Sequence, residues 1–196
     1  MRWLWVITAL GVGGFFAVHY TAARPIERPP GVTAPSSPVQ IALSQPLRLE
    51  KNGVSLSAIA SFELEARVIL KHVYNDTGAR IAPVDLALGW GRMSDTAVLR
   101  RIRFWQSSRF YFWQTREYPI PREEIERSSA NMHMIPANSF IERRLKGLKP
   151  GNLVRIHGYL VNAQAPDGFY WNTSLTREDT GGGACELVWV ESLSIR

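Results

Sequence analysis

The sequence predicts a mainly β protein of the α+β class, with short peripheral helices and one amino-terminal helix that enters a membrane. Residues 62–71 alternate between apolar and mostly charged side chains, which is the period of a half-buried strand. Turn residues such as those at 166–168 separate further apolar runs. Residues 3–23 contain no Lys, Arg, Asp or Glu, and a helix of that length spans the hydrocarbon core of a bilayer.

The first segment, residues 1–23, is predicted to be a membrane anchor or a signal peptide. Tryptophans near its start and a tyrosine near its end are typical of the aromatic belts of a resident span, which favours the anchor. Small residues before Arg24 keep a cleavable signal open as the alternative. We therefore expect a single-pass protein of a bacterial inner membrane, which contacts the lipid bilayer through residues 3–23. Its carboxy-terminal domain is expected on the periplasmic or extracytoplasmic side.

A proline-rich segment, residues 24–45, follows the predicted anchor. It contains five prolines, which fix φ and remove backbone donors, so an extended spacer is expected. The folded domain is then predicted to cover residues 46–196, a length that suits one hydrophobic core.

Strands dominate the predicted domain, and the helices are short. The predicted strands, in chain order, cover residues 53–59, 62–71, 101–106, 110–114, 153–161, 169–174 and 185–191. Short helices are expected at 95–101, 122–127 and 139–146, opened by Ser94, Pro121 and Asn138, which are residue types found at helix starts.

One turn and the strand that follows it resemble part of a known kind of small β-barrel domain. Residues 150–152 read Pro-Gly-Asn and lead into the apolar strand at 153–161, a pattern similar to strands of OB or SH3-like barrels. The resemblance implies a small barrel of five to seven strands. It covers a short part of the chain and implies no particular function.

Composition narrows the classes of function. The net charge of +6 indicates an anionic partner only weakly. A single cysteine excludes an intramolecular disulfide framework and a cysteine-rich zinc site. The sequence contains no P-loop, dinucleotide fingerprint, His-Glu-x-x-His motif or nucleophile-elbow serine, so the commonest enzyme chemistries have no sequence support and no cofactor is expected.

Arginine and aromatic residues are interleaved over residues 100–116, which hold five Arg and no Asp or Glu. Such a segment can neutralise and stack on a polyanion, or lie on a membrane surface. A hairpin with one buried aromatic face and one solvated charged face explains the same alternation without a ligand.

Trp90 lies between two glycines and precedes Arg92, so it can serve as a recognition platform beside an anion-binding arginine, or as a plug that seals the core. The plug is the favoured interpretation of Trp90. The candidate binding residues are Trp90, Arg92, Arg101, Arg103, Trp105, Arg109, Trp113 and Arg177.

Cys185 follows a glycine-rich stretch whose backbone could approach an anion or an oxyanion. A thiol enzyme can be drawn with Cys185 as nucleophile, His133 or His157 as base, Asp179 or Glu186 as the orienting carboxylate and Arg177 as anion clamp. The candidate catalytic set is Cys185, His133 and Asp179. The alternative is that Cys185 is a small buried apolar residue.

Met132, His133 and Met134 form a third candidate. On an extended chain the two thioethers share one face, which suits Cu(I), while His133 points to the other face. Packing in the core is the more common use of such a methionine pair.

The sequence thus favours the hypothesis that the chain is a membrane-anchored, exported binding or assembly module of the bacterial envelope, without catalytic activity. The expected partner is an envelope protein or an anionic glycan or lipid, and nucleic acid is not expected. The alternatives are a thiol enzyme that uses Cys185 and a Met/His metal-binding module.

Overall fold

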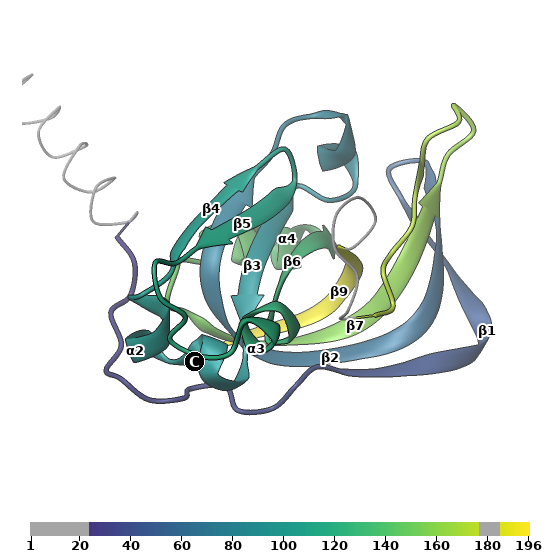
Figure 1. Cartoon of the computed structure of the whole chain (residues 1–196). Helices are drawn as coiled ribbons and strands as arrows, with labels where there is room; N and C mark the ends of the chain where they lie inside the picture. The colour runs from purple at the N-terminus through teal and green to yellow at the C-terminus, as the bar shows by residue number, and fades with distance from the viewer. Residues whose placement is uncertain (1–23, 177–184) are drawn as a thin grey trace, which may run out of the picture.

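The computed structural model describes residues 24–176 and 185–196 (Figure 1). It has a seven-stranded sheet, a separate two-stranded sheet and a few short helices, which confirms the predicted mainly β fold. The predicted membrane segment, residues 3–23, lies outside the described residues. Within the described ranges, no helix combines the length and the apolar character needed to cross a bilayer.

Nine strands are present in the described part of the chain. They are β1 (Val39–Lys51), β2 (Val54–Val73), β3 (Val84–Gly89), β4 (Arg103–Ser107), β5 (Phe110–Gln114), β6 (Ser129–Pro136), β7 (Leu153–Gln164), β8 (Tyr170–Trp171) and β9 (Glu186–Ile195). The α-helices are α2 (Thr96–Leu99), α3 (Arg122–Arg127) and α4 (Ser139–Gly147), and the 3-10 helices are η1 (Thr77–Arg80) and η2 (Gly91–Ser94).

The large sheet closes on itself through its longest strand. Its strand order is β1-β2-β3-β6-β9-β7-β8, and β2 also pairs with β7. The strands β2, β3, β6, β9 and β7 therefore form a closed ring of hydrogen-bonded neighbours. All of these pairings are antiparallel except β6–β9, which is parallel, and α4 lies in the connection between β6 and β7.

The ring encloses the central core. Alternate residues of β2, including Phe62 and Leu64, meet Met132 and Met134 of β6 there. The helix α4 contributes Ile141 to the same core, and its amino terminus is capped because the Asn138 side chain accepts a hydrogen bond from the Ile141 amide. Both methionines are fully buried, so they act as packing residues of the core.

The proline-rich segment lies along the surface of the domain (Figure 1). The amide of Ile26 donates to the Pro150 carbonyl at 2.7 Å, and the amides of Thr33 and Ala34 both donate to the Ser94 hydroxyl at 3.0 Å. We call residues 26–34 the N-terminal strap. The first strand, β1, begins at Val39, before the predicted domain start at Pro46.

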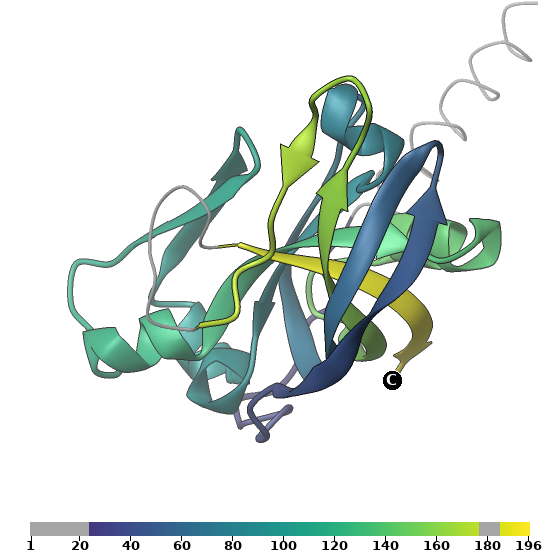
Figure 2. The ribbon, with the colours of Figure 1, turned by 90° about the vertical axis from the view of Figure 1, so that its right-hand side faces the viewer.

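The two-stranded sheet is a hairpin of β4 and β5, and it covers the outer face of β3 and β6. Figure 2 shows this hairpin on the opposite side of the molecule from β1. Phe104, Tyr111 and Trp113 of the hairpin pack on a small core that includes Ala87 of β3 and Ile125 of α3. The hairpin is therefore attached by side chains, because its strands make no ladder with the large sheet.

Candidate binding surface

The outward face of the β4–β5 hairpin is aromatic. Because side chains alternate along a strand, Phe104 and Tyr111 turn inward while Trp105, Phe110 and Phe112 turn outward. The outward rings are 41%, 37% and 41% exposed, respectively. The sequence left open a hairpin with one buried aromatic face and one solvated charged face. In the structure, both faces of the hairpin carry aromatic rings.

These outward rings contact one another. Trp105 and Phe112 stack with centroids 5.5 Å apart and planes 16° apart, and Phe110 lies 6.5 Å from Phe112. The guanidinium of Arg103 lies 5.9 Å from the centre of the Trp105 ring. We call Arg103, Trp105, Phe110 and Phe112 the hairpin face. Stacked, solvent-exposed rings beside a cation form a surface suited to recognition.

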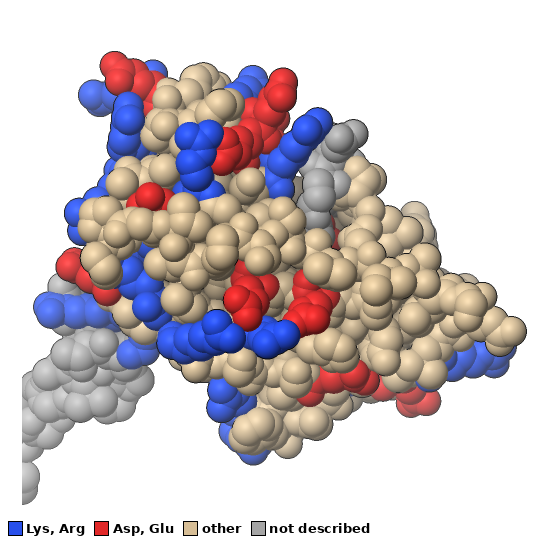
Figure 3. Space-filling model, turned by 90° about the horizontal axis from the view of Figure 1, so that it is seen from below, with Lys and Arg blue, Asp and Glu red and all other residues tan. Residues whose placement is uncertain are grey.

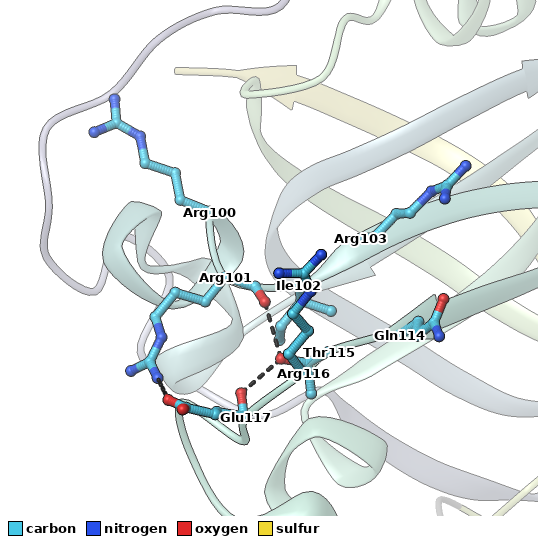
Figure 4. Close-up of a pocket in the computed structure, with 8 residues that line it drawn as sticks. All are labelled: Arg100, Arg101, Ile102, Arg103, Gln114, Thr115, Arg116 and Glu117. Carbon is cyan, nitrogen blue, oxygen red and sulfur yellow. Dashed lines mark hydrogen bonds and ion pairs between the residues drawn. The ribbon is translucent and has the colours of Figure 1, made fainter.

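An open groove of about 690 Å³ lies at the base of the hairpin (Figure 4). It is lined by Arg100, Arg101, Arg103 and Arg116 together with Gln114 and Glu117, and we call it the arginine groove. Arg101 points to Glu117 at 3.4 Å, whereas Arg100 and Arg103 point away from that carboxylate (Figure 4). Within the described residues, Arg101 is the one arginine of the four with a carboxylate partner. The groove therefore carries excess positive charge.

The base of the groove is fixed by the backbone. The Thr115 hydroxyl contacts the carbonyl oxygens of Arg101 and Glu117 at 2.9 and 2.6 Å. A second open groove of about 420 Å³ shares Gln114 and Thr115 with the first and includes Trp105 among its aromatic walls. Cationic and aromatic surfaces are thus continuous around the hairpin.

More positive charge lies beside the groove, where α2 meets the N-terminal strap. Burial lowers the pKa of Arg67, and the positive charges of Arg28 and Arg100 lower it further. Asp95 opposes this effect, and it also accepts a hydrogen bond from the Gly31 amide of the strap at 2.8 Å. Figure 3 shows Lys and Arg side chains gathered along the left margin, which is the side on which α2 lies in Figure 1.

Trp90 and Arg92, which were also predicted to bind, lie away from the hairpin face and the arginine groove. Trp90 is 2% exposed and belongs to the central core, so its ring seals the core and is not part of a surface. Its neighbour Gly89 leaves room for the chain, since a Cβ there would lie 2.3 Å from the Met93 carbonyl oxygen. Arg92 forms a two-contact ion pair with Glu124, which ties η2 to α3.

His133 is part of a buried polar cluster beneath the hairpin. Its Nδ1 lies 2.9 Å from Asp85, its neighbour in the β3–β6 register, and its ring packs 4.4 Å from the Trp171 ring. Asn131, on the same face of β6, accepts a hydrogen bond from Gln106 at 2.8 Å. Asp85, the carboxylate beside His133, was not among the residues predicted from the sequence. A lone acidic residue inside the apolar run of residues 83–88 was the available signal.

Arg109 also belongs to this cluster and not to the open surface. It stands at the tip of the hairpin, but its side chain is only 14% exposed and contacts Asp76 and Asp85. The prediction of Arg109 as a surface-binding residue is therefore corrected.

The residues of the proposed thiol site are described only in part. Cys185 is half-buried just before β9, whose parallel register places Leu187, not the cysteine, opposite His133. His157 is exposed on β7 and lies 3.8 Å from Glu191. Asp179 and Arg177, the predicted orienting carboxylate and anion clamp, lie outside the described residues.

The methionine pair does not face His133. Met132 and Met134 point into the central core, whereas His133 lies on the outer face of β6 beside Asp85. Across residues 24–176 and 185–196, no group of three or more His, Cys, Asp or Glu is arranged to hold a metal ion.

Comparison with known proteins gives no match to any protein family, any curated protein or any solved structure.

Proposed function

We propose that the chain is a non-catalytic binding module, anchored through residues 3–23, whose hairpin face and arginine groove contact the anionic headgroups of a phospholipid membrane. The surrounding fold is proposed to be a small five-stranded barrel of the OB type. The closed ring of β2, β3, β6, β9 and β7 supports this assignment, and β4–β5 is an insertion between two of its strands.

The observation that carries the proposal is the combination of exposed stacked rings and an adjoining groove of arginines. Aromatic rings are favoured at the level of lipid headgroups, where one side is apolar and the other is wet. Arginine binds phosphate through its planar fork. Trp105 and Phe112 supply the rings, and Arg103 belongs to both the hairpin face and the groove.

The position of the groove favours a membrane over a protein partner. The groove begins at Arg100, directly after α2, and the N-terminal strap is hydrogen-bonded to Asp95 at the start of that helix. The strap and α2 lie on the same side of the molecule (Figure 1). A bilayer reached through the preceding residues would therefore lie near a basic surface, and each basic residue close to an anionic bilayer contributes about 1 kcal/mol.

Hydrogen exchange of the full-length chain in nanodiscs tests the proposal, because every sample keeps the same amino-terminal segment. We expect the amides of residues 100–117 to exchange more slowly in nanodiscs that contain phosphatidylglycerol than in phosphatidylcholine nanodiscs. The difference should disappear in high salt, since exposed charge interactions are screened.

A pair of matched variants shows whether the groove is responsible. Arg103→Glu/Arg116→Glu should reduce the docking equilibrium by at least about thirtyfold, since two basic contacts of about 1 kcal/mol each are lost and reversed. Arg48→Glu/Arg143→Glu makes the same change of net charge on β1 and α4 and should leave the protection unchanged. Equal exchange in both kinds of nanodisc, or equal loss in both variants, would reject the proposal.

A further inference from the structure

The guanidinium of Arg109 lies between two aromatic rings. Its central carbon is 4.1 Å from the centre of the Tyr74 ring and 5.2 Å from the centre of the Trp171 ring. Both distances are within the range of cation–π attraction, which is strongest where the cation is shielded from water. Such paired rings are a common way to bind a cationic group.

Carboxylates and a carbonyl complete the surroundings of this group. Nε and Nη2 of Arg109 donate to the two oxygens of Asp76 at 3.0 and 2.6 Å, while Nη1 donates to Asp85 at 3.2 Å and to the Ala82 carbonyl at 3.0 Å. The hydrogen bond from Arg109 holds the pKa of Asp76 below its usual value. One wall is bare backbone, since a Cβ on Gly78 would lie 3.2 Å from Nη2. These contacts match the planar fork of a guanidinium.

We call Tyr74, Asp76, Asp85, Trp171 and the Ala82 carbonyl the guanidinium seat. None of these groups belongs to the hairpin that carries Arg109. The seat is built from the segment around η1 and from β3 and β8, whereas the hairpin forms a separate two-stranded sheet. The seat and its occupant can therefore separate without breaking a strand pairing of the large sheet.

The backbone at the tip of the hairpin, which places Arg109 in the seat, is in a strained conformation. Ser107 pairs with Phe110, so Ser108 and Arg109 form a two-residue turn, and their φ angles are +50° and +67°. Such turns favour Asn-Gly, because other residues are disfavoured at positive φ. A two-stranded hairpin is marginally stable by itself, so contacts such as those of Arg109 stabilise its packing against the large sheet.

The floor beneath the tip is polar, although it is buried. Asp85, Asn131 and His133 are fully or almost fully buried, and the Asn131 side chain donates to the Arg109 carbonyl at 2.9 Å. Buried charged groups give little net stability compared with apolar packing of similar volume. A hairpin that served only to cover the sheet would need no carboxylates beneath it.

We propose that the guanidinium seat is a binding site for an arginine side chain of a partner polypeptide, and that Arg109 occupies this site while the hairpin is closed. The partner arginine enters when the hairpin tip lifts, so closure and binding exclude one another. The site is separate from the hairpin face and does not depend on the proposed contact with lipid.

The affinity of the empty seat for a guanidinium ligand predicts how far that ligand opens the hairpin of the wild type. A ligand that binds only the open state multiplies the open population by 1 + [L]/Kd. In the full-length Arg109→Ala variant the seat is empty, so the Kd of methylguanidinium can be measured directly by nuclear magnetic resonance. Methylammonium carries the same charge without the fork, and it should bind at least about tenfold more weakly.

The same methylguanidinium should then open the hairpin of the wild-type chain. At nine times the Kd measured for Arg109→Ala, we expect the amides of residues 103–114 to exchange about tenfold faster. Amides of β2 and β7 should be unaffected, which separates opening of the hairpin from general denaturation. Unchanged exchange of residues 103–114 at that concentration, or equal effects of methylguanidinium and methylammonium, would overturn the proposal.

A second variant covers the case in which Arg109→Ala does not fold. Asp76→Asn weakens the seat at a half-exposed position and leaves Arg109 in place. We expect the hairpin amides to exchange at least about tenfold faster in Asp76→Asn without added ligand, while the amides of β2 stay as in the wild type. If hairpin exchange in Asp76→Asn equals that of the wild type, the seat does not hold the hairpin closed and the proposal fails.

Discussion

At the scale of single residues, Tyr111 shows how the hairpin attaches to the body. Its hydroxyl lies 2.6 Å from the Ser129 hydroxyl, which in turn donates to the Ile125 carbonyl at 2.7 Å. Burial of the ring raises the pKa of Tyr111 to about 12. This phenol must therefore stay protonated while the hairpin is packed.

The raised pKa of Tyr111 predicts a loss of stability in alkali. An unfolded tyrosine ionises near pH 10, so the contribution of Tyr111 to stability is complete below about pH 10 and falls as pH rises toward 12. The total loss is about 3 kcal/mol for a difference of two pKa units. The free energy of unfolding measured with urea should therefore fall more steeply between pH 9 and 12 for the wild type than for Tyr111→Phe. Parallel curves would contradict this assignment.

The chemistry of single residues was only partly predictable from sequence. His133 stood out as a candidate, but its partner Asp85 is distant in the chain and is brought close by the β3–β6 register. Arg109 was expected at the surface because it belongs to the interleaved arginine and aromatic segment of residues 100–116. Its side chain folds back because Asp76 and two rings lie within reach of the tip.

At the scale of elements, strands with one exposed face were predictable and fully buried strands were not. β2 and β7 alternate between buried and more exposed residues, so their pattern is visible in the sequence. β3 is buried at every position and β6 at nearly every position, so neither shows a period of two. The sequence around β3 therefore indicated a glycine-flanked tryptophan, Trp90, but no strand.

The N-terminal strap is another element whose position the composition did not reveal. Proline content predicts an extended chain, but it does not predict the hydrogen bonds that fix the strap to the domain. Ser94 provides the central contact, since its hydroxyl accepts from two strap amides and donates to the Gly91 carbonyl at 2.7 Å.

Replacement of Ser94 by alanine should release the strap. Two backbone donors would lose their acceptor, which costs about 1–3 kcal/mol when such groups are buried. We expect the amides of residues 31–34 to exchange at least about fivefold faster in Ser94→Ala. The exposed Ser55→Ala on β2 serves as the control. Exchange as slow in Ser94→Ala as in Ser55→Ala would show that the strap is held by other contacts.

At the scale of the whole molecule, closure of the ring depends on a tight crossing of β7 and β9. The β7–β9 register shifts between His157 and Gly158, and a Cβ on Gly158 would lie 1.8 Å from the Trp189 carbonyl oxygen. Only glycine allows this approach. The sequence showed the strand around Gly158 but not its closure, because closure is decided by pairings between distant segments.

We therefore expect Gly158→Ala to destabilise the entire domain. The added methyl group must displace backbone, which costs about 1–3 kcal/mol and should lower the urea midpoint of unfolding. Gly147→Ala is the matched control, because a Cβ there meets nothing within 4 Å. A midpoint for Gly158→Ala within error of that for Gly147→Ala would contradict the proposed role of this crossing.

The N-terminal strap also determines how the domain would respond to mechanical load. Arg28 donates to the carbonyl oxygens of Gly151 and Arg196, so tension applied near Arg24 would pass into both the turn before β7 and the far end of the polypeptide. These hydrogen bonds are not part of the strand pairings of the ring, so their loss would leave the ring paired. Under load the strap can therefore detach from the domain while the strands of the ring stay paired.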